Sequence, residues 1–338
     1  MLLHHNISLQ PYNSFGLDVL GQYVAIIRHA EEIEEVYAMP RLRPLPKMAL
    51  GEGSNILFVG NQRKVFLKIE IDGIEIVEDH DDHVIVEVGA GVIWHQFVLW
   101  CVENNLGGVE NLSLIPGTVG AAPIQNIGAY GVELEGVFHS LDAVNGKTGH
   151  TKTFQSKDCQ FGYRYSVFKA ELKGKYLITK VRFQLTKKHQ YNISYGNLKS
   201  TLEDAGVEQL SLGAISDAVI QIRQSKLPDP AQIGNAGSFF KNPLVEKPLQ
   251  EALLALYPDM PSFPFDDQWC KIPAAWLIDQ CGWKGKRRGD IGVHDKQPLV
   301  LVNFGGGRGR DIFKLSKDIQ KSVESTFGIL LQPEVNIV

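Results

Sequence analysis

The feature that most restricts the fold is a long stretch of small residues, IPGTVGAAPIQNIGAYG, at positions 115–131. It shows neither the period of an amphipathic helix nor the alternation of a strand. Its glycines and alanines let the backbone approach another group closely, while Thr118, Gln125, Asn126 and Tyr130 supply hydrogen-bonding groups. A long loop without secondary structure is uncommon unless it is functional. We therefore favour ligand binding over a purely structural connection for this stretch.

A second glycine-rich loop, GEGSN at residues 51–55, follows an apolar run. A dinucleotide fingerprint of the G-x-G-x-x-G type is excluded, because Ile56 replaces the third glycine and the strand-like ILFV follows where a helix is needed. Backbone N–H groups in such a turn still cradle phosphate oxygens in other proteins. For this loop alone, a tight hairpin turn is the better interpretation. Two such loops in one domain favour a dinucleotide lying between them.

The composition fits a globular protein with two or three domains. The chain has 338 residues, of which 44% are hydrophobic and 21% charged, and its net charge is −4. This mildly acidic balance argues against broad binding of nucleic acid or anionic membranes. No apolar run approaches the ~20 residues of a spanning helix, and no secretory signal is evident.

The cysteines and histidines do not indicate a metal site. The four cysteines are scattered without CxxC spacing, which is typical of reduced thiols in a cytosolic protein. The only close histidine pairs, His4–His5 and His80/His83, lie in polar surroundings. We therefore predict a cytoplasmic protein with no metal.

Runs of strands and separate helices, without steady βαβ alternation, predict an α+β fold. A hairpin is expected over residues 73–91, because two β-branched runs flank a charged turn. Residues 212–226 have helical periodicity, and KLPDP ends that helix at the best candidate for a domain boundary. Residues 311–328 form a second amphipathic helix, followed by a C-terminal strand.

The stretch GNAGSFFKNP, residues 234–243, places Ser238 between glycines and two phenylalanines. Glycine and asparagine favour turns, because both tolerate positive φ. The alternative is a backbone that wraps closely around a ligand and presents Ser238 to it. Taken alone, this stretch favours the turn.

Ten motifs together resemble the UDP-N-acetylenolpyruvoylglucosamine reductase family (MurB family, tyrosine-loop type). They occur in the order of that family from about residue 13 to residue 336. They are NSFGLD, GEGSNIL, IPGTVGAAPIQNIGAYGVE, CQFGYRYSVFK, SYGNL, KLPDP, GNAGSFFKNP, AAWLIDQCGWKG, VHDKQPLVLVN and LQPEV.

The resemblance implies a two-part FAD-binding fold of the vanillyl-alcohol-oxidase (PCMH) type and a third, α+β substrate-binding domain. The expected boundaries are residues 1–66 with 328–338 for the first FAD-binding subdomain, 67–227 for the second, and 228–327 for the substrate domain. The C-terminal strand is expected to return to the first subdomain.

The resemblance also implies the activity, a flavin oxidoreductase reaction in peptidoglycan precursor synthesis. NADPH and the enolpyruvyl UDP-sugar are expected to use one site in turn, and the protein is expected to be a monomer. FAD is expected to be noncovalent, because neither GEGSN nor IPGTVGAAP contains the His or Cys that tethers flavin in related oxidases. The expected cofactor-binding residues are Gly51, Glu52, Gly53, Ser54, Asn55, Ile115, Pro116, Gly117, Thr118, Gly120, Ala121, Ala122, Ile124, Gln125, Asn126, Gly128, Ala129, Tyr130 and Gly131.

Three residues match the catalytic positions of the family. Ser238 matches the proton donor, and a free hydroxyl needs a cationic or hydrogen-bonding neighbour, for which Lys226 is the candidate. Arg164 matches the group that stabilises the enolate, since a planar guanidinium suits a carboxylate. Glu334 is expected to act protonated, because an ionised carboxylate would repel the developing charge. Without the motifs, Ser238 would be interpreted as a turn residue and Lys226 as a lysine at the end of a helix. Arg164 would be interpreted as part of a surface salt bridge, and Glu334 as an exposed carboxylate on a strand.

The remaining substrate contacts implied by the family are Tyr163, Tyr195, Asn242 and Gln297. One departure is Phe263, which stands where this type of loop usually presents a tyrosine to the diphosphate. A ring without a hydroxyl packs but does not donate. The glycine-rich NFGGGRGRD, residues 303–311, is interpreted as a variable turn before a helix.

Two other functions remain open. An FAD-dependent oxidase of the same superfamily would use oxygen in place of NADPH. A non-catalytic nucleotide-sugar-binding protein would not need Arg164, Ser238 and Glu334 together.

Overall fold

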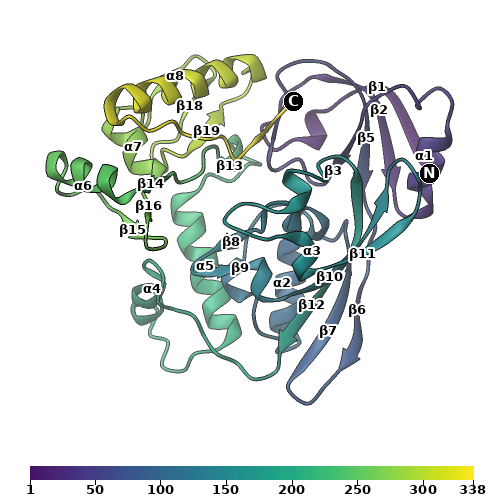
Figure 1. The fold of residues 1–338 in the computed structure, drawn as a ribbon, viewed down its shortest axis with the longest axis horizontal. Helices are drawn as coiled ribbons and strands as arrows, with labels where there is room; N and C mark the ends of the chain where they lie inside the picture. Colours follow the sequence, from purple (N-terminus) through teal and green to yellow (C-terminus); the bar gives the residue numbers. More distant parts are fainter. The chain divides into compact units, whose positions relative to one another are not determined.

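The computed structural model describes all residues, 1–338 (Figure 1), and divides into two compact units. Unit 1 comprises Met1–Ile7, Gly21–Glu52 and Arg63–Ser225. Unit 2 comprises Ser8–Leu20, Gly53–Gln62 and Lys226–Val338. The boundary at 225/226 coincides with the end of the helix that the KLPDP motif terminates.

A four-stranded sheet in unit 1 has the order β1-β2-β5-β3. Strands β3 and β5 pair in parallel, so they are not a hairpin. The acidic helix α1 (Glu31–Ala38) follows β2 and buries Ile33 and Val36. The strands are β1 (Leu2–Ser8), β2 (Leu20–Ile27), β3 (Lys47–Leu50) and β5 (Gln62–Ile69).

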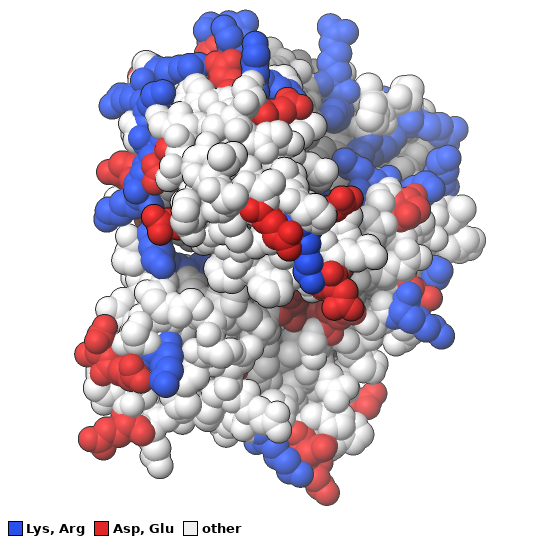
Figure 2. All heavy atoms as spheres, turned by 60° about the vertical axis from the view of Figure 1, so that its left-hand side comes forward, with Lys and Arg blue, Asp and Glu red and all other residues white.

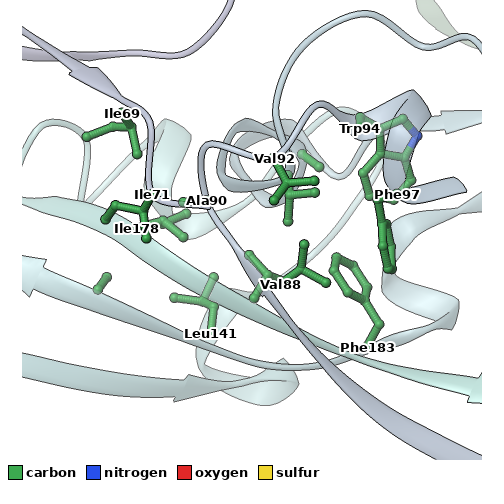
Figure 3. Close-up of a cluster of buried hydrophobic side chains, with 14 of the residues drawn as sticks. Ile69, Ile71, Val88, Ala90, Val92, Trp94, Phe97, Leu141, Ile178 and Phe183 are labelled. Carbon is green, nitrogen blue, oxygen red and sulfur yellow. The ribbon is translucent and has the colours of Figure 1, made fainter. Parts of the chain in front are cut away.

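The second sheet of unit 1 is antiparallel, with the order β11-β10-β12-β7-β6. The predicted hairpin is confirmed, since β6 pairs with β7 across a short charged turn. The helix α2 (Trp94–Glu103) packs on this sheet, with the Phe97 and Phe183 rings 4.8 Å apart. Figure 3 shows Trp94 and Phe97 lying over Phe183 and Val88 in the core. The strands are β6 (Ile74–Asp79), β7 (His83–Gly89), β10 (Phe138–Asn145), β11 (Thr151–Gln155) and β12 (Tyr176–Thr186).

Short elements complete unit 1 and include the small-residue stretch at positions 115–131. The expectation that this stretch has no secondary structure is wrong, because it forms a 3-10 helix, η3 (Val119–Gln125), and a short strand, β8. Short 3-10 helices of this kind are frequent as connectors between other elements. The other elements are η2 (Glu110–Leu112), β8 (Gly128–Ala129), β9 (Val132–Glu133), η4 (Leu134–Gly136), α3 (Ser156–Cys159), η5 (Val167–Lys169), α4 (Leu198–Asp204) and α5 (Leu212–Lys226).

Unit 2 contains a four-stranded sheet, β13-β19-β18-β17, and a three-stranded sheet, β14-β16-β15. The predicted amphipathic helix is α8, and it buries a stripe formed by Ile312, Leu315, Ile319, Val323 and Phe327. The elements are η1 (Gln10–Tyr12), β13 (Gly234–Ser238), β14 (Leu244–Glu246), α6 (Lys247–Leu256), β15 (Phe263–Pro264), β16 (Trp269–Lys271), α7 (Ala274–Gln280), β17 (Arg287–Arg288), β18 (Ile291–Val293), β19 (Val300–Asn303) and α8 (Gly309–Phe327).

The C-terminal segment returns to the first part of the chain, as expected. Gly328 ends α8 with a φ of 70°, and β20 (Asn336–Ile337) pairs in parallel with β4 (Ile56–Leu57). The hairpin interpretation of GEGSN is therefore wrong, because the strands on its two sides pair with different partners. The C-terminal strand is also shorter than expected. The division into subdomains at residues 66, 227 and 328 stays a prediction.

Charges of both signs occur on the face drawn in Figure 2, separated by wide uncharged areas. No helix combines the length and apolarity needed to cross a bilayer. No group of three or more His, Cys, Asp or Glu side chains is arranged to hold a metal ion.

Candidate active site

Ser238 lies at the end of strand β13 in unit 2, so the simple-turn interpretation of GNAGSFFKNP is wrong. The strand pairs with β19, and a bulge interrupts the register between Asn235 and Ser238. Gly237 has a φ of 65° within that bulge, a conformation that favours glycine. The buried Asn235 side chain fixes the bulge, since its Oδ1 accepts the Gly237 N–H at 2.9 Å.

Gly234 is required for close approach of two backbone segments. A Cβ at Gly234 would lie 2.2 Å from the carbonyl oxygen of Phe15. The next residue, Asn235, donates its N–H to the Ser14 carbonyl. Residues of the NSFGLD motif therefore lie directly against β13 within unit 2.

Glu334 lies beside Ser238 along the backbone of unit 2. The Glu334 N–H donates to the carbonyl of Phe239 at 2.8 Å, and Phe240 bridges to Pro333. Phe239 is fully buried and donates its own N–H to Leu299. Ser238 is thus held between a buried aromatic anchor and the bulge, on the segment that pairs with the Glu334 segment.

Asn55 of the first glycine-rich loop also contacts this C-terminal segment. Its Nδ2 donates to the Glu334 carbonyl at 3.4 Å, and its carbonyl accepts from Asn336. Gly53 is tightly placed in the same unit, because a Cβ there would lie 2.0 Å from the Tyr12 carbonyl oxygen. Ser54 lies between them, half-buried. Part of the loop assigned to the cofactor thus belongs to the same unit as Ser238.

Four predicted substrate residues lie elsewhere in unit 2. Asn242 accepts the N–H of Ala274 at the start of α7 through its Oδ1, which leaves its amide nitrogen to donate. Gln297 follows the turn after β18, and its backbone N–H donates to His294 Nδ1. Phe263 is 47% exposed on β15. Lys226 is the exposed last residue of α5.

Arg164 lies in unit 1, in a tight hairpin turn with Tyr163 closed by two bonds between Gly162 and Tyr165. Its φ of 54° is rare for a residue with a side chain. The guanidinium donates to the Gly128 carbonyl at 2.8 Å and lies over the Tyr163 ring, 5.4 Å from its centroid. Backbone strain at such a position often accompanies a functional site.

Hydrogen bonds connect the small-residue loop of residues 115–131 to the turn that contains Arg164. Asn126 is fully buried with a φ of 44° and donates to Glu133 and to the Gly162 carbonyl. The buried Ser166 donates to the Ile124 carbonyl, and Lys169 donates to Gln125. The structure thus brings the Tyr163–Arg164 turn and this loop together in unit 1.

The two glycine-rich loops meet at Gly51 and Thr118. A Cβ on Gly51 would lie 2.7 Å from Thr118 Oγ1, so only glycine fits without displacement. A Cβ on Gly120 would likewise lie 2.5 Å from the Cβ of Ala90. Glu52 is ion-paired with Lys68. The two loops predicted to bind the cofactor therefore lie against each other in unit 1. We call the part formed by Gly51 and residues 115–131 the cradle.

Arg223 on α5 was missed by the sequence reasoning. Its Nε atom is buried and has no hydrogen-bond partner, and burial lowers the pKa of its guanidinium. It interacts electrostatically with Tyr130, whose pKa burial raises. The sequence did contain a signal, because Arg223 follows Ile222 on the apolar face of this helix. A charged group on a buried face normally needs a partner. An anionic ligand would supply that partner.

The remaining predicted residues line the same part of unit 1. Tyr195 is 46% exposed, and a Cβ on Gly131 would lie 3.3 Å from it. Asn192 donates to the Gly131 carbonyl. Ile115, Pro116, Gly117, Ala121, Ala122 and Ala129 belong to the loop that carries these contacts.

The close contact of the two glycine-rich loops and the buried Nε of Arg223 on an α+β frame fit an FAD-binding flavoprotein. Residues 21–155 match the family model for an FAD binding domain, and residues 229–338 match the C-terminal domain of UDP-N-acetylenolpyruvoylglucosamine reductase. The chain belongs to the UDP-N-acetylenolpyruvoylglucosamine reductase family, and it is an oxidoreductase with FAD as its cofactor.

Curated relatives match over the whole length. The chain is 47% identical to UDP-N-acetylenolpyruvoylglucosamine reductase of Amoebophilus asiaticus, with 100% of both chains covered. It is 45% identical to that of Flavobacterium johnsoniae, again over 100% of both. It is 46% identical to that of Pseudomonas aeruginosa, with 99% of this chain and 98% of the relative covered.

Solved structures show the same fold. UDP-N-acetylenolpyruvylglucosamine reductase from Thermus caldophilus has a TM-score of 0.69 at 21% identity, with 99% of each chain covered. A solvent-stable cholesterol oxidase has a TM-score of 0.54 at 12% identity, covering 99% of this chain and 86% of the oxidase. The predicted fold class, an FAD-binding fold of the vanillyl-alcohol-oxidase type with a further α+β domain, is confirmed.

Proposed function

We propose that this chain reduces UDP-N-acetyl-3-O-(1-carboxyvinyl)-glucosamine to UDP-N-acetylmuramate with NADPH, in the synthesis of peptidoglycan precursors. The observation that carries the proposal is the full-length identity of 45–47% to reductases of this name. The pairing of the Ser238 and Glu334 segments supports it, because it gives the two predicted catalytic groups a common frame.

The residues of the unit 1 cradle fit FAD. Bound there, FAD would supply the hydride chemistry that side chains do not perform. Gly51, Thr118 and Gly120 would lie close to the cofactor, and Gly51 and Gly120 carry no side chain that would displace Thr118 or Ala90. Arg223 would donate the N–H of its buried Nε, which has no hydrogen-bond partner in the protein, to an anionic or carbonyl group of the cofactor.

Ser238 is proposed to give its hydroxyl proton to the substrate carbon after reduction. The bulge at Gly237 and the buried Phe239 hold the serine backbone, so its short side chain is presented from a fixed position. Lys226 is proposed to assist by stabilising the alkoxide that remains. Positioning of this kind is how general acids contribute to catalysis.

Glu334 and Arg164 are proposed to stabilise the charge that develops on the substrate carboxylate. Glu334 would donate a hydrogen bond in its protonated form. Arg164 would present a planar guanidinium, oriented by the Gly128 carbonyl and the Tyr163 ring. Tyr163, Tyr195, Asn242 and Gln297 are the proposed contacts for the rest of the substrate, and Phe263 is proposed to pack without donating.

NADPH and the UDP-sugar are proposed to occupy one site in turn, in a cytoplasmic monomer. Steady-state kinetics would then give parallel double-reciprocal lines, with each substrate inhibiting competitively against the other at high concentration. Intersecting lines would contradict a shared site.

An anaerobic absorbance experiment tests the function. NADPH should bleach the flavin band, and the UDP-sugar alone should then restore it. The oxidase alternative predicts little bleaching by NADPH and rapid recovery with oxygen. A non-catalytic binding protein would show a spectral shift with the UDP-sugar but no recovery of a reduced flavin.

A further inference from the structure

The segment that leads into the small-residue loop is clamped to the start of α2 by several hydrogen bonds within unit 1. Trp94 donates its indole N–H to Leu112 and its backbone N–H to Gly117, each at 2.9 Å. Val119 donates its N–H to Val92. Between these fixed points, the N–H of Leu114 donates to Nδ1 of His95 at 3.0 Å.

The bond to His95 is the only one of these clamps made by a titratable group, and it acts at a strained residue. Leu114 has a φ of 58°, in the left-handed region that a side chain disfavours. Such a conformation persists only where the surroundings over-determine it. The strained residue lies directly before Ile115, where the cradle assigned to FAD begins.

The hydrogen bond fixes the protonation state of His95. Nδ1 accepts only when it carries no proton, so the neutral ring has its proton on Nε2. If Nδ1 also carried a proton, its N–H would face the N–H of Leu114, and two donors cannot form a hydrogen bond with each other. The charged group that faces His95 is Arg223 on α5, with Tyr130 next to Arg223, whereas Glu110 faces Cys101 farther along α2. Burial, and then Arg223, lower the pKa of His95.

We propose that His95 is a positioning residue that holds Leu114 in its left-handed conformation and so couples FAD affinity to the protonation of its ring. This rests on the proposed placement of FAD in the cradle. Neutral His95 holds the segment before residue 115 against the start of α2. Protonated His95 releases Leu114, and the loop loses the geometry that binds FAD.

The test measures FAD dissociation from the holoprotein by recovery of flavin fluorescence, between about pH 5 and pH 8. In the wild type, affinity should fall as the pH drops below the pKa of His95, approaching about tenfold per pH unit. His95→Asn retains an acceptor near the Nδ1 position but does not titrate. It should bind FAD at neutral pH within about threefold of the wild type and show a flat pH profile.

His95→Leu removes the acceptor and should weaken FAD binding by roughly tenfold at every pH. His139→Asn is the matched control, because His139 is half-buried on β10 and contacts Ser140 instead. It should leave both affinity and pH profile unchanged, and thermal unfolding would confirm that each variant is folded.

A wild-type pH profile that persists in His95→Asn, or a flat wild-type profile, would overturn the proposal and leave the cofactor assignment intact. A folded protein that does not bind FAD even at neutral pH would overturn the proposed function itself.

Discussion

The backbone N–H of Glu334 donates to the carbonyl of Phe239, the residue directly after Ser238, across 2.8 Å. The proposed proton donor and the proposed charge-stabilising carboxylate thus lie on two paired segments. Because Phe239 is fully buried, the pairing is tied to the core of unit 2. A change at either segment is therefore transmitted to the other.

Ser238→Ala should separate the two half-reactions. Flavin reduction by NADPH needs no proton donated to substrate carbon, so it should survive. Reoxidation by the UDP-sugar should fall by about 10²–10⁴-fold, the usual contribution of a general acid. Rapid-mixing absorbance, with one substrate at a time, measures each step.

Ser238→Cys is the companion variant, and Ser200→Ala on the exposed surface of α4 is the control. A thiol has an unperturbed pKa of about 8.5 and is a better acid than a hydroxyl, so the cysteine variant should retain more activity than the alanine variant. The role of Ser238 is falsified if the alanine variant reoxidises at the wild-type rate.

Phe263→Tyr should lower the Michaelis constant for the UDP-sugar, if this exposed residue of β15 approaches the diphosphate. One neutral hydrogen bond contributes about 0.5–1.5 kcal/mol, so the improvement should be at most about tenfold. Phe265→Tyr, at a similarly exposed position two residues away, is the control. Unchanged or weaker binding in Phe263→Tyr would show that the loop has lost its family role.

Gly51→Ala should reduce FAD binding, because the new methyl group would lie 2.7 Å from Thr118 Oγ1. The double variant with Thr118→Ala removes that clash and should recover part of the affinity. Gly60→Ala is the control, since a Cβ there meets no atom within 4 Å. Equilibrium titration with FAD measures all three, and an undiminished affinity in Gly51→Ala would rule out the close meeting of the two loops.

The flavin should be removable without breaking a covalent bond. Acid precipitation should leave a yellow supernatant, because the two loops assigned to FAD hold no His or Cys for tethering. A yellow pellet would instead favour the oxidase-like mode of attachment.

Asp142→Asn should lower stability at neutral pH and have a smaller effect in acid. Burial alone would raise the pKa of Asp142, but hydrogen bonds from Arg182 and Thr153 reverse that effect and the net pKa is lowered. A lowered carboxyl pKa stabilises the fold above the unfolded value of 3.8 and loses this contribution as the pH falls through the folded value.

Urea unfolding at neutral pH should show a loss of about 1–3 kcal/mol in Asp142→Asn. The difference from the wild type should shrink steadily below about pH 4. Asp81→Asn, in the exposed turn after β6, is the control and should behave like the wild type at both pH values. A difference that does not depend on pH would mean that the carboxylate charge is not the cause.

Periodicity predicted the elements whose burial is set locally. The helices α5 and α8 follow from spacing, because one face of each packs on a core, and the hairpin of β6 and β7 follows from two β-branched runs around a charged turn. Nothing local indicates that Ile56–Leu57 pairs with Asn336–Ile337, since strands of two residues carry no pattern. Long-range pairing is decided by the packing of the whole unit.

The site was predictable in residue types more than in geometry. The motifs pointed to Ser238 and Arg164, but not to the bulge at Gly237 or the left-handed turn at Arg164. These conformations depend in part on partners distant in sequence, which are strand β19 for the bulge and Gly128 for Arg164. Arg223 was missed because arginine is usually exposed on a helix, although its position four residues after the buried Val219 places it on the apolar side of α5, where its Nε is buried.

Unit 2 is assembled from three separate lengths of chain, Ser8–Leu20, Gly53–Gln62 and Lys226–Val338. During synthesis, the first two leave the ribosome long before the third exists. Strand β4 therefore cannot pair until Asn336 and Ile337, which are made almost last, have been synthesised. A newly made chain exposes this unpaired edge throughout translation, so chaperone dependence and sensitivity to proteases should be greatest in nascent chains.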